Sequence, residues 1–109
     1  MPTEKVPGLN TGDQDRPLSA ETDMDEFVAI RRDIHQHPEL SFQEHRTSDL
    51  VAACLTQYGY KVERGLGGTG VVGQLKRGNG KKHLGLRADM DALPIQETGA
   101  VDWKSQQAG

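Results

Sequence analysis

The 109-residue sequence is poor in cysteine and aromatic residues, and it contains no long apolar run. Its one cysteine, Cys54, excludes an internal disulfide framework and favours a reducing compartment. No segment approaches the length of a membrane span, and the first twenty residues lack the apolar core of a signal peptide. The sequence therefore predicts a cytoplasmic protein with no membrane partner.

The charge balance also excludes a class of partner. The formal net charge is -3, which does not suit a nucleic-acid-binding protein. Four basic residues, Lys76, Arg77, Lys81 and Lys82, flank a turn, but no aromatic residue lies among them. We interpret them as a solvated tip and expect no nucleic-acid partner.

The chain divides into a tail and one small domain. Residues 1–20 are rich in Pro, Gly, Asp and Thr, which predicts a disordered tail. A first helix follows, with Thr22 as its N-cap and acidic residues in its first turn. Pro38 should end this helix, because the residue before a proline is displaced from the helical region. Its apolar stripe consists of Met24, Phe27, Val28, Ile30 and Ile34.

A second helix has clear signals at both ends. Ser41 and Glu44 have the spacing of a capping box, and Gly59 predicts a left-handed stop. Between these ends, apolar residues recur at helical spacing. Cys54 lies on this stripe, which favours a core position over a nucleophilic role. The stripe consists of Leu50, Val51, Cys54, Leu55 and Tyr58.

From Tyr60 onward the pattern changes to that of β-strands. Strands are predicted over residues 60–63, 70–77 and 82–88, and Asn79-Gly80 is a strong hairpin-turn signal. The fold class is therefore α/β or α+β, with two N-terminal helices followed by strands and a hairpin. No internal repeat is present.

Residues 65–70 match the pattern G-x-G-x-x-G, and Asp89 lies nineteen residues beyond Gly70. In a dinucleotide-binding fold, the third glycine opens a helix whose amides hold the pyrophosphate. Here Val71 and Val72 follow Gly70 and predict a strand instead. A flexible strand-to-strand loop is therefore the favoured interpretation, and dinucleotide binding is the weaker alternative.

Histidines and aspartates are the candidate functional residues. His35 and His37 form an H-x-H pair, but residues two apart on a helix point about 200° away from each other. We therefore favour polar side chains at a helix end over a metal site. His45 should lie on an exposed helix face and His83 on a strand.

Asp89 and Asp91 flank Met90 at the end of the third predicted strand. If the chain stays extended there, the two side chains share one side, about 6.5–7 Å apart. Ligands of open α/β sheets bind beyond the carboxyl ends of strands, where these acids fall. A turn in which the acids cap their own amides remains an alternative.

Three segments together resemble the opening of a hydrolase family that includes hippurate hydrolase, N-acyl-amino-acid hydrolases and auxin-conjugate hydrolases. They are "RRDIHQHPELSFQEHRTSDLV", "TGVVGQL" and "LGLRADMDALPIQE". The resemblance implies a di-metal exopeptidase-like catalytic domain with two divalent ions such as Zn, Mn or Co. It also implies a smaller lid domain, a homodimer and hydrolysis of N-acyl amino acids. Residues 21–109 would then be the truncated start of this catalytic domain, incomplete at the C-terminus.

The resemblance also implies roles for the acidic pair. In the wider superfamily the matching strand ends in H-x-D-x-V-P, so Asp89 stands where a metal-binding His is usual and Asp91 at the Asp that supports it. Asp91 would hold a metal-binding imidazole in place, as supporting carboxylates do, and Arg87 would screen the pair. The resemblance places further ligands in a later H-x-C-G-H-D segment.

No metal ligand is therefore assigned within this chain, and no bound metal is expected in it. We expect the chain alone to be inactive. The alternative is a truncated, non-catalytic remnant that acts as an interaction module through exposed strand edges.

Overall fold

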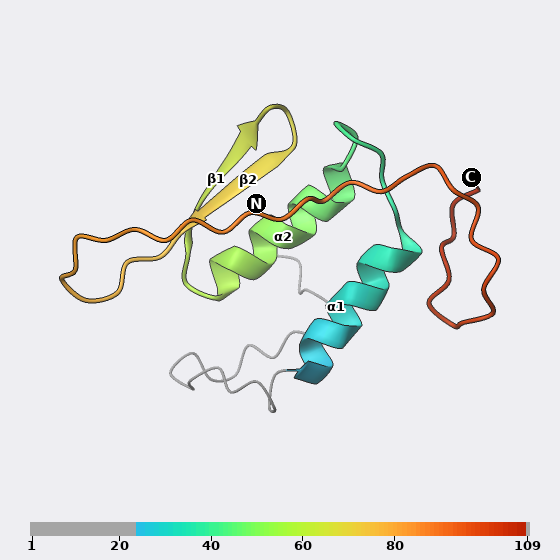
Figure 1. Ribbon diagram of the computed structural model, residues 1–109, viewed down its shortest axis with the longest axis horizontal. Helices are drawn as coiled ribbons and strands as arrows, with labels where there is room; N and C mark the ends of the chain where they lie inside the picture. The colour runs from blue at the N-terminus through green and yellow to red at the C-terminus, as the bar shows by residue number, and fades with distance from the viewer. Residues whose placement is uncertain (1–23, 109) are drawn as a thin grey trace.

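The computed structural model describes residues 24–108, in which two helices precede a two-stranded antiparallel sheet (Figure 1). The elements are α1 (Met24–Gln36), α2 (His45–Gln57), β1 (Lys61–Leu66) and β2 (Gly70–Gln74). The coarse prediction of two helices followed by a hairpin is thereby confirmed. The predicted tail and the Thr22 cap lie outside the described residues. No helix within residues 24–108 is long and apolar enough to cross a membrane.

Helix α1 carries acidic residues in its first turn and ends two residues before Pro38, as predicted. None of its residues is fully buried. Ile30 packs on the small core around Cys54, and the rings of Phe27 and Tyr58 lie 6.3 Å apart. The guanidinium of Arg46 on α2 donates to both carboxylate oxygens of Asp33, at 2.8 and 3.0 Å. The two helices are thus joined by a narrow apolar contact and an ion pair.

The predicted capping box at the start of α2 is wrong. The helix begins at His45, and the Glu44 side chain makes no cap hydrogen bond to it. Instead the Glu44 carboxylate accepts from the amide of Phe42, at 2.8 Å, and from the hydroxyl of Thr69. Ser41 lies in a turn closed by the amide of Gln43 and the carbonyl of Leu40, so it is not an N-cap.

The free amides of α2 are capped by Glu39, which precedes the helix in sequence by six residues. Its carboxylate accepts from the backbone amides of Arg46, at 2.9 Å, and Thr47, at 2.6 Å, and from the Thr47 hydroxyl at 2.7 Å. A carboxylate at this end also complements the positive end of the helix dipole. The loop between Pro38 and His45 therefore folds back onto the helix that it introduces.

The other end of α2 follows the prediction. Gly59 has φ +89, and its amide donates to the carbonyl of Thr56. The next amide, of Tyr60, donates to the carbonyl of Leu55, which completes a Schellman stop. Cys54 is buried as predicted, and burial raises the pKa of its thiol, so the thiol stays protonated at neutral pH.

Strands β1 and β2 form the hairpin that packs against α2 (Figure 1). The glycine-rich loop 65–70 joins them, with Gly67 and Gly68 at positive φ. The third glycine of the motif opens a strand and not a helix, as the favoured interpretation predicted. A β-carbon on Gly73 would lie 3.0 Å from Leu55, so this glycine lets α2 approach the sheet closely.

The hairpin predicted at Asn79-Gly80, between strands 70–77 and 82–88, is wrong; the hairpin observed joins β1 and β2. Residues 75–88 form no strand; a turn at Gly78 and Asn79 separates two unpaired stretches. His83 therefore lies in a loop and not on a strand. Leu84 and Leu86 are 87% and 90% exposed. A strand pattern becomes a strand only when a neighbour accepts its hydrogen bonds and covers its apolar face, and the described residues provide neither.

Candidate functional site

After residue 80 the chain runs back across α2 towards α1 (Figure 1). A cavity lies between this returning segment and residues of the helices and the hairpin. Its volume is about 1110 Å³. Its ionisable histidine, acidic and basic lining residues come from two distant parts of the sequence: His35 on α1, and Arg87, Asp89, Asp91 and Glu97 on the returning segment. Apolar side chains of α2 and β2 line the opposite wall, including Val51, Leu55 and Val71.

Asp89 and Asp91 both line this cavity and are both exposed. Arg87, expected to screen the acids, pairs with one of them: its guanidinium lies 2.8 Å from the Asp89 carboxylate. The expected setting is wrong, since the acids follow an extended, unpaired segment and not the carboxyl end of a strand. The acidic pair is therefore placed by loop contacts and not by a sheet.

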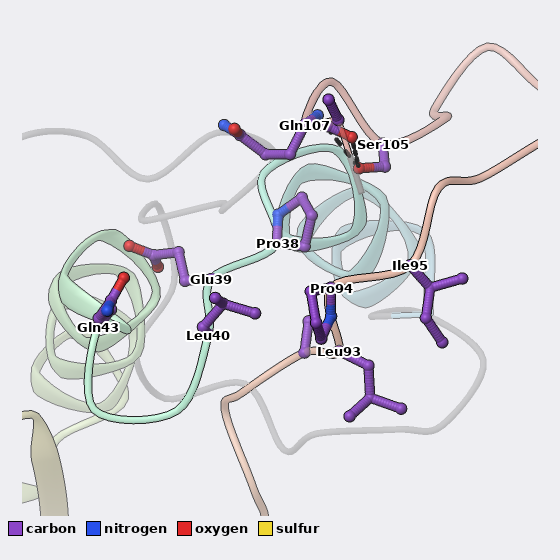
Figure 2. A pocket seen from close by; sticks show the side chains of 11 residues that line it. Pro38, Glu39, Leu40, Gln43, Leu93, Pro94, Ile95, Ser105 and Gln107 are labelled. Atoms are coloured by element: carbon purple, nitrogen blue, oxygen red, sulfur yellow. Dashed lines mark hydrogen bonds between the residues drawn. The ribbon is translucent and has the colours of Figure 1, made fainter.

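One of these contacts joins the segment that contains the acids to the segment that contains Glu39. The backbone amide of Ala92, next to Asp91, donates to the carbonyl of Glu39 at 2.8 Å. A smaller cavity of about 330 Å³ lies beside this contact, between the loop from Pro38 to Gln43 and the segment from Ala92 to Ile95 (Figure 2). One loop thus caps α2 with the Glu39 side chain and holds the acidic segment with the Glu39 carbonyl.

The carboxylates of this loop have lowered pKa values. Burial raises the pKa of Glu39, but hydrogen bonds from the Thr47 hydroxyl and the Arg46 and Thr47 amides outweigh it, so the net shift is downward. The pKa of Glu44 is also lowered, chiefly by the hydrogen bond from Thr69. Both groups therefore stay ionised at neutral pH and hold donors of α2 and of the glycine-rich loop.

The two histidines of the H-x-H pair have separate partners. His37 Nδ1 donates to the carbonyl of Asp33 at 2.9 Å, within the end of α1. The Nε2 atom of His35 instead contacts both carboxylate oxygens of Glu97, with 3.1 Å to Oε2. This contact is the main cause of the lowered pKa of Glu97. The two imidazoles thus contact different partners, a backbone carbonyl for His37 and a carboxylate for His35.

Glu97 belongs to a loop that contacts α1, and the sequence predicted no role for it. The Arg32 guanidinium lies 3.7 Å from the centre of the Trp103 ring. The Gln36 side chain donates to the carbonyl of Asp102 at 3.1 Å, and the Gln36 carbonyl accepts from the amide of Gln106 at 2.9 Å. The i, i+3, i+4 spacing of Arg32, His35 and Gln36 was the available signal, because it places them on one helix face.

The described residues do not form a metal centre. Among residues 24–108, no group of three or more His, Cys, Asp and Glu side chains converges in a way that could hold an ion. The metal pair that the family resemblance implies therefore does not fit the side chains of residues 24–108.

Known proteins similar to this chain are mostly named as hydrolases or carboxypeptidases. An exception is a putative glutamate–cysteine ligase of Rhodococcus jostii, 39% identical over 100 residues, a match covering 92% of this chain and 12% of that protein. The chain is 54% identical over 81 residues to hippurate hydrolase of Campylobacter jejuni, a match covering 74% of this chain and 21% of that protein. It is 49% identical to thermostable carboxypeptidase 2 of Saccharolobus solfataricus, covering 78% of this chain and 22% of the relative. It is 46% identical to IAA-amino acid hydrolase ILR1-like 2 of Arabidopsis thaliana, covering 78% and 19%.

The chain thus spans about a fifth of the length of the hippurate hydrolase, the carboxypeptidase and the IAA-amino acid hydrolase. No family model matches it, and no solved structure matches it.

Proposed function

Because this chain is homologous over about three quarters of its length to hippurate hydrolases and amidohydrolases, as its motifs predicted, we propose that it supplies part of a metal-dependent hydrolase of N-acyl amino acids. The observation that carries the proposal is the 54% identity to a hippurate hydrolase. The names of the other relatives support the same chemistry, since hippurate and indoleacetyl amino acids each contain an amide bond between an acyl group and an amino acid.

Within this proposal the chain contributes a scaffold and two carboxylates. Asp91 and Asp89 face a cavity large enough for a small acyl amino acid, and Arg87 beside Asp89 reduces the repulsion between the two acids. Water attack on an amide carbonyl needs a polarising group and a base. Residues 24–108 hold no ligand set for a metal, so we expect the 109-residue chain alone to be inactive.

A chimera tests the proposal directly. The matching part of Campylobacter hippurate hydrolase is replaced by this chain, and release of benzoate from hippurate is measured with and without a chelator. We expect the chimera to hydrolyse hippurate and to lose that activity with chelator. The isolated chain, assayed in parallel with added Zn²⁺, Mn²⁺ or Co²⁺, should release no benzoate above the blank.

Substitutions in the chimera then test the acidic pair. Asp91→Asn should lower activity by about 10- to 100-fold, the usual effect of removing a carboxylate that supports a metal ligand. Asp25→Asn, on the exposed start of α1, is the matched control and should leave activity unchanged. A folded but inactive chimera would contradict the proposal, and full activity in Asp91→Asn would remove Asp91 from the site.

A further inference from the structure

The segment that follows the acidic pair, residues 92–97, is held at two points. Both of its partners lie in the stretch from His35 to Glu39. At its start the Ala92 amide donates to the carbonyl of Glu39 at 2.8 Å. At its end the Glu97 carboxylate contacts the His35 imidazole. Four residues therefore lie between Ala92 and Glu97 on the segment, and three lie between His35 and Glu39 on the other side.

Apolar packing does little to hold the segment between these points. Leu93 is 71% exposed and Ile95 is 67% exposed. The one backbone hydrogen bond recorded inside the segment is local, from the Ile95 amide to the Leu93 carbonyl, across Pro94. Figure 2 shows the Leu93 and Ile95 side chains on the segment of the chain near Pro38. The two polar attachments therefore hold the segment more than apolar packing does.

The second attachment belongs to the same cavity as the acids, since His35, Asp89, Asp91 and Glu97 all line it. We propose that His35 and Glu97 are positioning residues, whose contact fixes the exit of the Asp89–Asp91 segment and so the direction from which these acids enter the cavity. The functional importance of this pair rests on the function proposed above, but the positioning itself does not.

The surroundings of Glu97 suit this role. Its Oε1 atom also accepts from the amide of Ser105 at 3.4 Å, and Lys104 lies close enough to favour its charge. Trp103, next in the same loop, stacks on Arg32 one turn before His35. One carboxylate thus joins the acidic segment, the loop after it and α1, with positive charge on two sides.

Hydrogen exchange of single amides tests the proposal on the 109-residue chain. The Ala92 amide reports on the acidic segment, and the Ser48 amide, which donates to the Glu44 carbonyl at 2.8 Å, reports on α2. His35→Gln and Glu97→Gln should each speed exchange at Ala92 on the order of five- to tenfold, the effect of losing about one hydrogen bond. Exchange at Ser48 should not change.

Three further variants make the test specific. His83→Gln, an exposed histidine outside the cavity, should leave both amides unchanged. The double variant His35→Gln/Glu97→Gln should exchange no faster at Ala92 than either single variant, because one contact can be lost only once. His35→Lys places a hydrogen-bond donor opposite Glu97 and should retain most of the protection.

Two results would overturn the proposal: unchanged exchange at Ala92 in both single variants, or equal acceleration at Ser48, which would indicate general destabilisation. Neither result involves catalysis. Failure here is therefore distinguishable from failure of the hydrolase proposal, which is measured by benzoate release from the chimera.

Discussion

At the scale of single residues, one side chain, Glu39, holds the start of α2. Its carboxylate accepts hydrogen bonds from two backbone amides of the first turn, which have no carbonyl partner within the helix, and from the hydroxyl of Thr47. Glu39→Ala should lower the free energy of unfolding by about 1–2 kcal/mol, the range for loss of an N-cap. Urea unfolding followed by circular dichroism measures it. Glu63→Ala, on the exposed face of β1, is the control, and an equal loss in both would contradict the assignment.

Phe42 is a second residue for which the backbone conformation supports a prediction. It has φ 65, a conformation that is strained for an aromatic residue, and 76% of its surface is exposed. Asparagine tolerates this conformation better, so Phe42→Asn should raise the free energy of unfolding by about 1 kcal/mol. Phe27→Asn has the opposite expectation, because the Phe27 ring contacts Tyr58. A loss of stability in Phe42→Asn would show that its exposed ring contributes more than the strain costs.

At the scale of elements, the β1–β2 hairpin depends on the close approach of Leu66 and Gly70, the residues on either side of its turn. A β-carbon on Gly70 would lie 2.3 Å from the carbonyl oxygen of Leu66, at the irregularity in the β1–β2 register. Gly70→Ala should therefore destabilise the chain by about 1–3 kcal/mol, the usual cost of forced overpacking. Gly80→Ala, where nothing lies within 4 Å, should cost far less. Thermal unfolding of the two variants compares them, and equal midpoints would contradict this account of the turn.

The elements also show what the sequence could predict. Helices α1 and α2 were predictable because their apolar stripes, Pro38 and Gly59 are local signals. The Glu39 cap was not, because it depends on a loop folding back across six residues to the helix start. The strand predicted over residues 82–88 was wrong for a related reason: its pattern is local, but a strand also requires a neighbour from elsewhere in the chain.

The residues of the candidate site also divide into those that the sequence could predict and those that it could not. The motif around Asp89 and Asp91 marked the acids as candidates, and Arg87, which belongs to the same motif, pairs with Asp89. Nothing local linked Glu97 to His35, since 62 residues separate them and the contact exists only once the returning segment lies along α1. Contacts of this kind follow from the path of the chain and not from a pattern in it.

At the scale of the whole molecule, three glutamates hold distant segments together, and this predicts the response to acid. Hydrogen bonds from Thr69 and His35 lower the pKa values of Glu44 and Glu97, and the donors around Glu39 outweigh the effect of its burial. A lowered pKa in the fold means that the ionised form is the stabilising one. Its contribution is complete above the unfolded value of 4.5 and is lost as pH falls through the lower folded value.

The urea midpoint should therefore fall steeply once the pH drops below about 4.5. Glu44→Gln keeps the size of the side chain but removes the charge, so it should have a lower midpoint at neutral pH and a shallower decline in acid. Glu63→Gln should follow the unmodified chain throughout. A midpoint that stays constant, or rises, as the pH falls from about 5 to about 3 would show that these carboxylates do not hold the segments together through their charge.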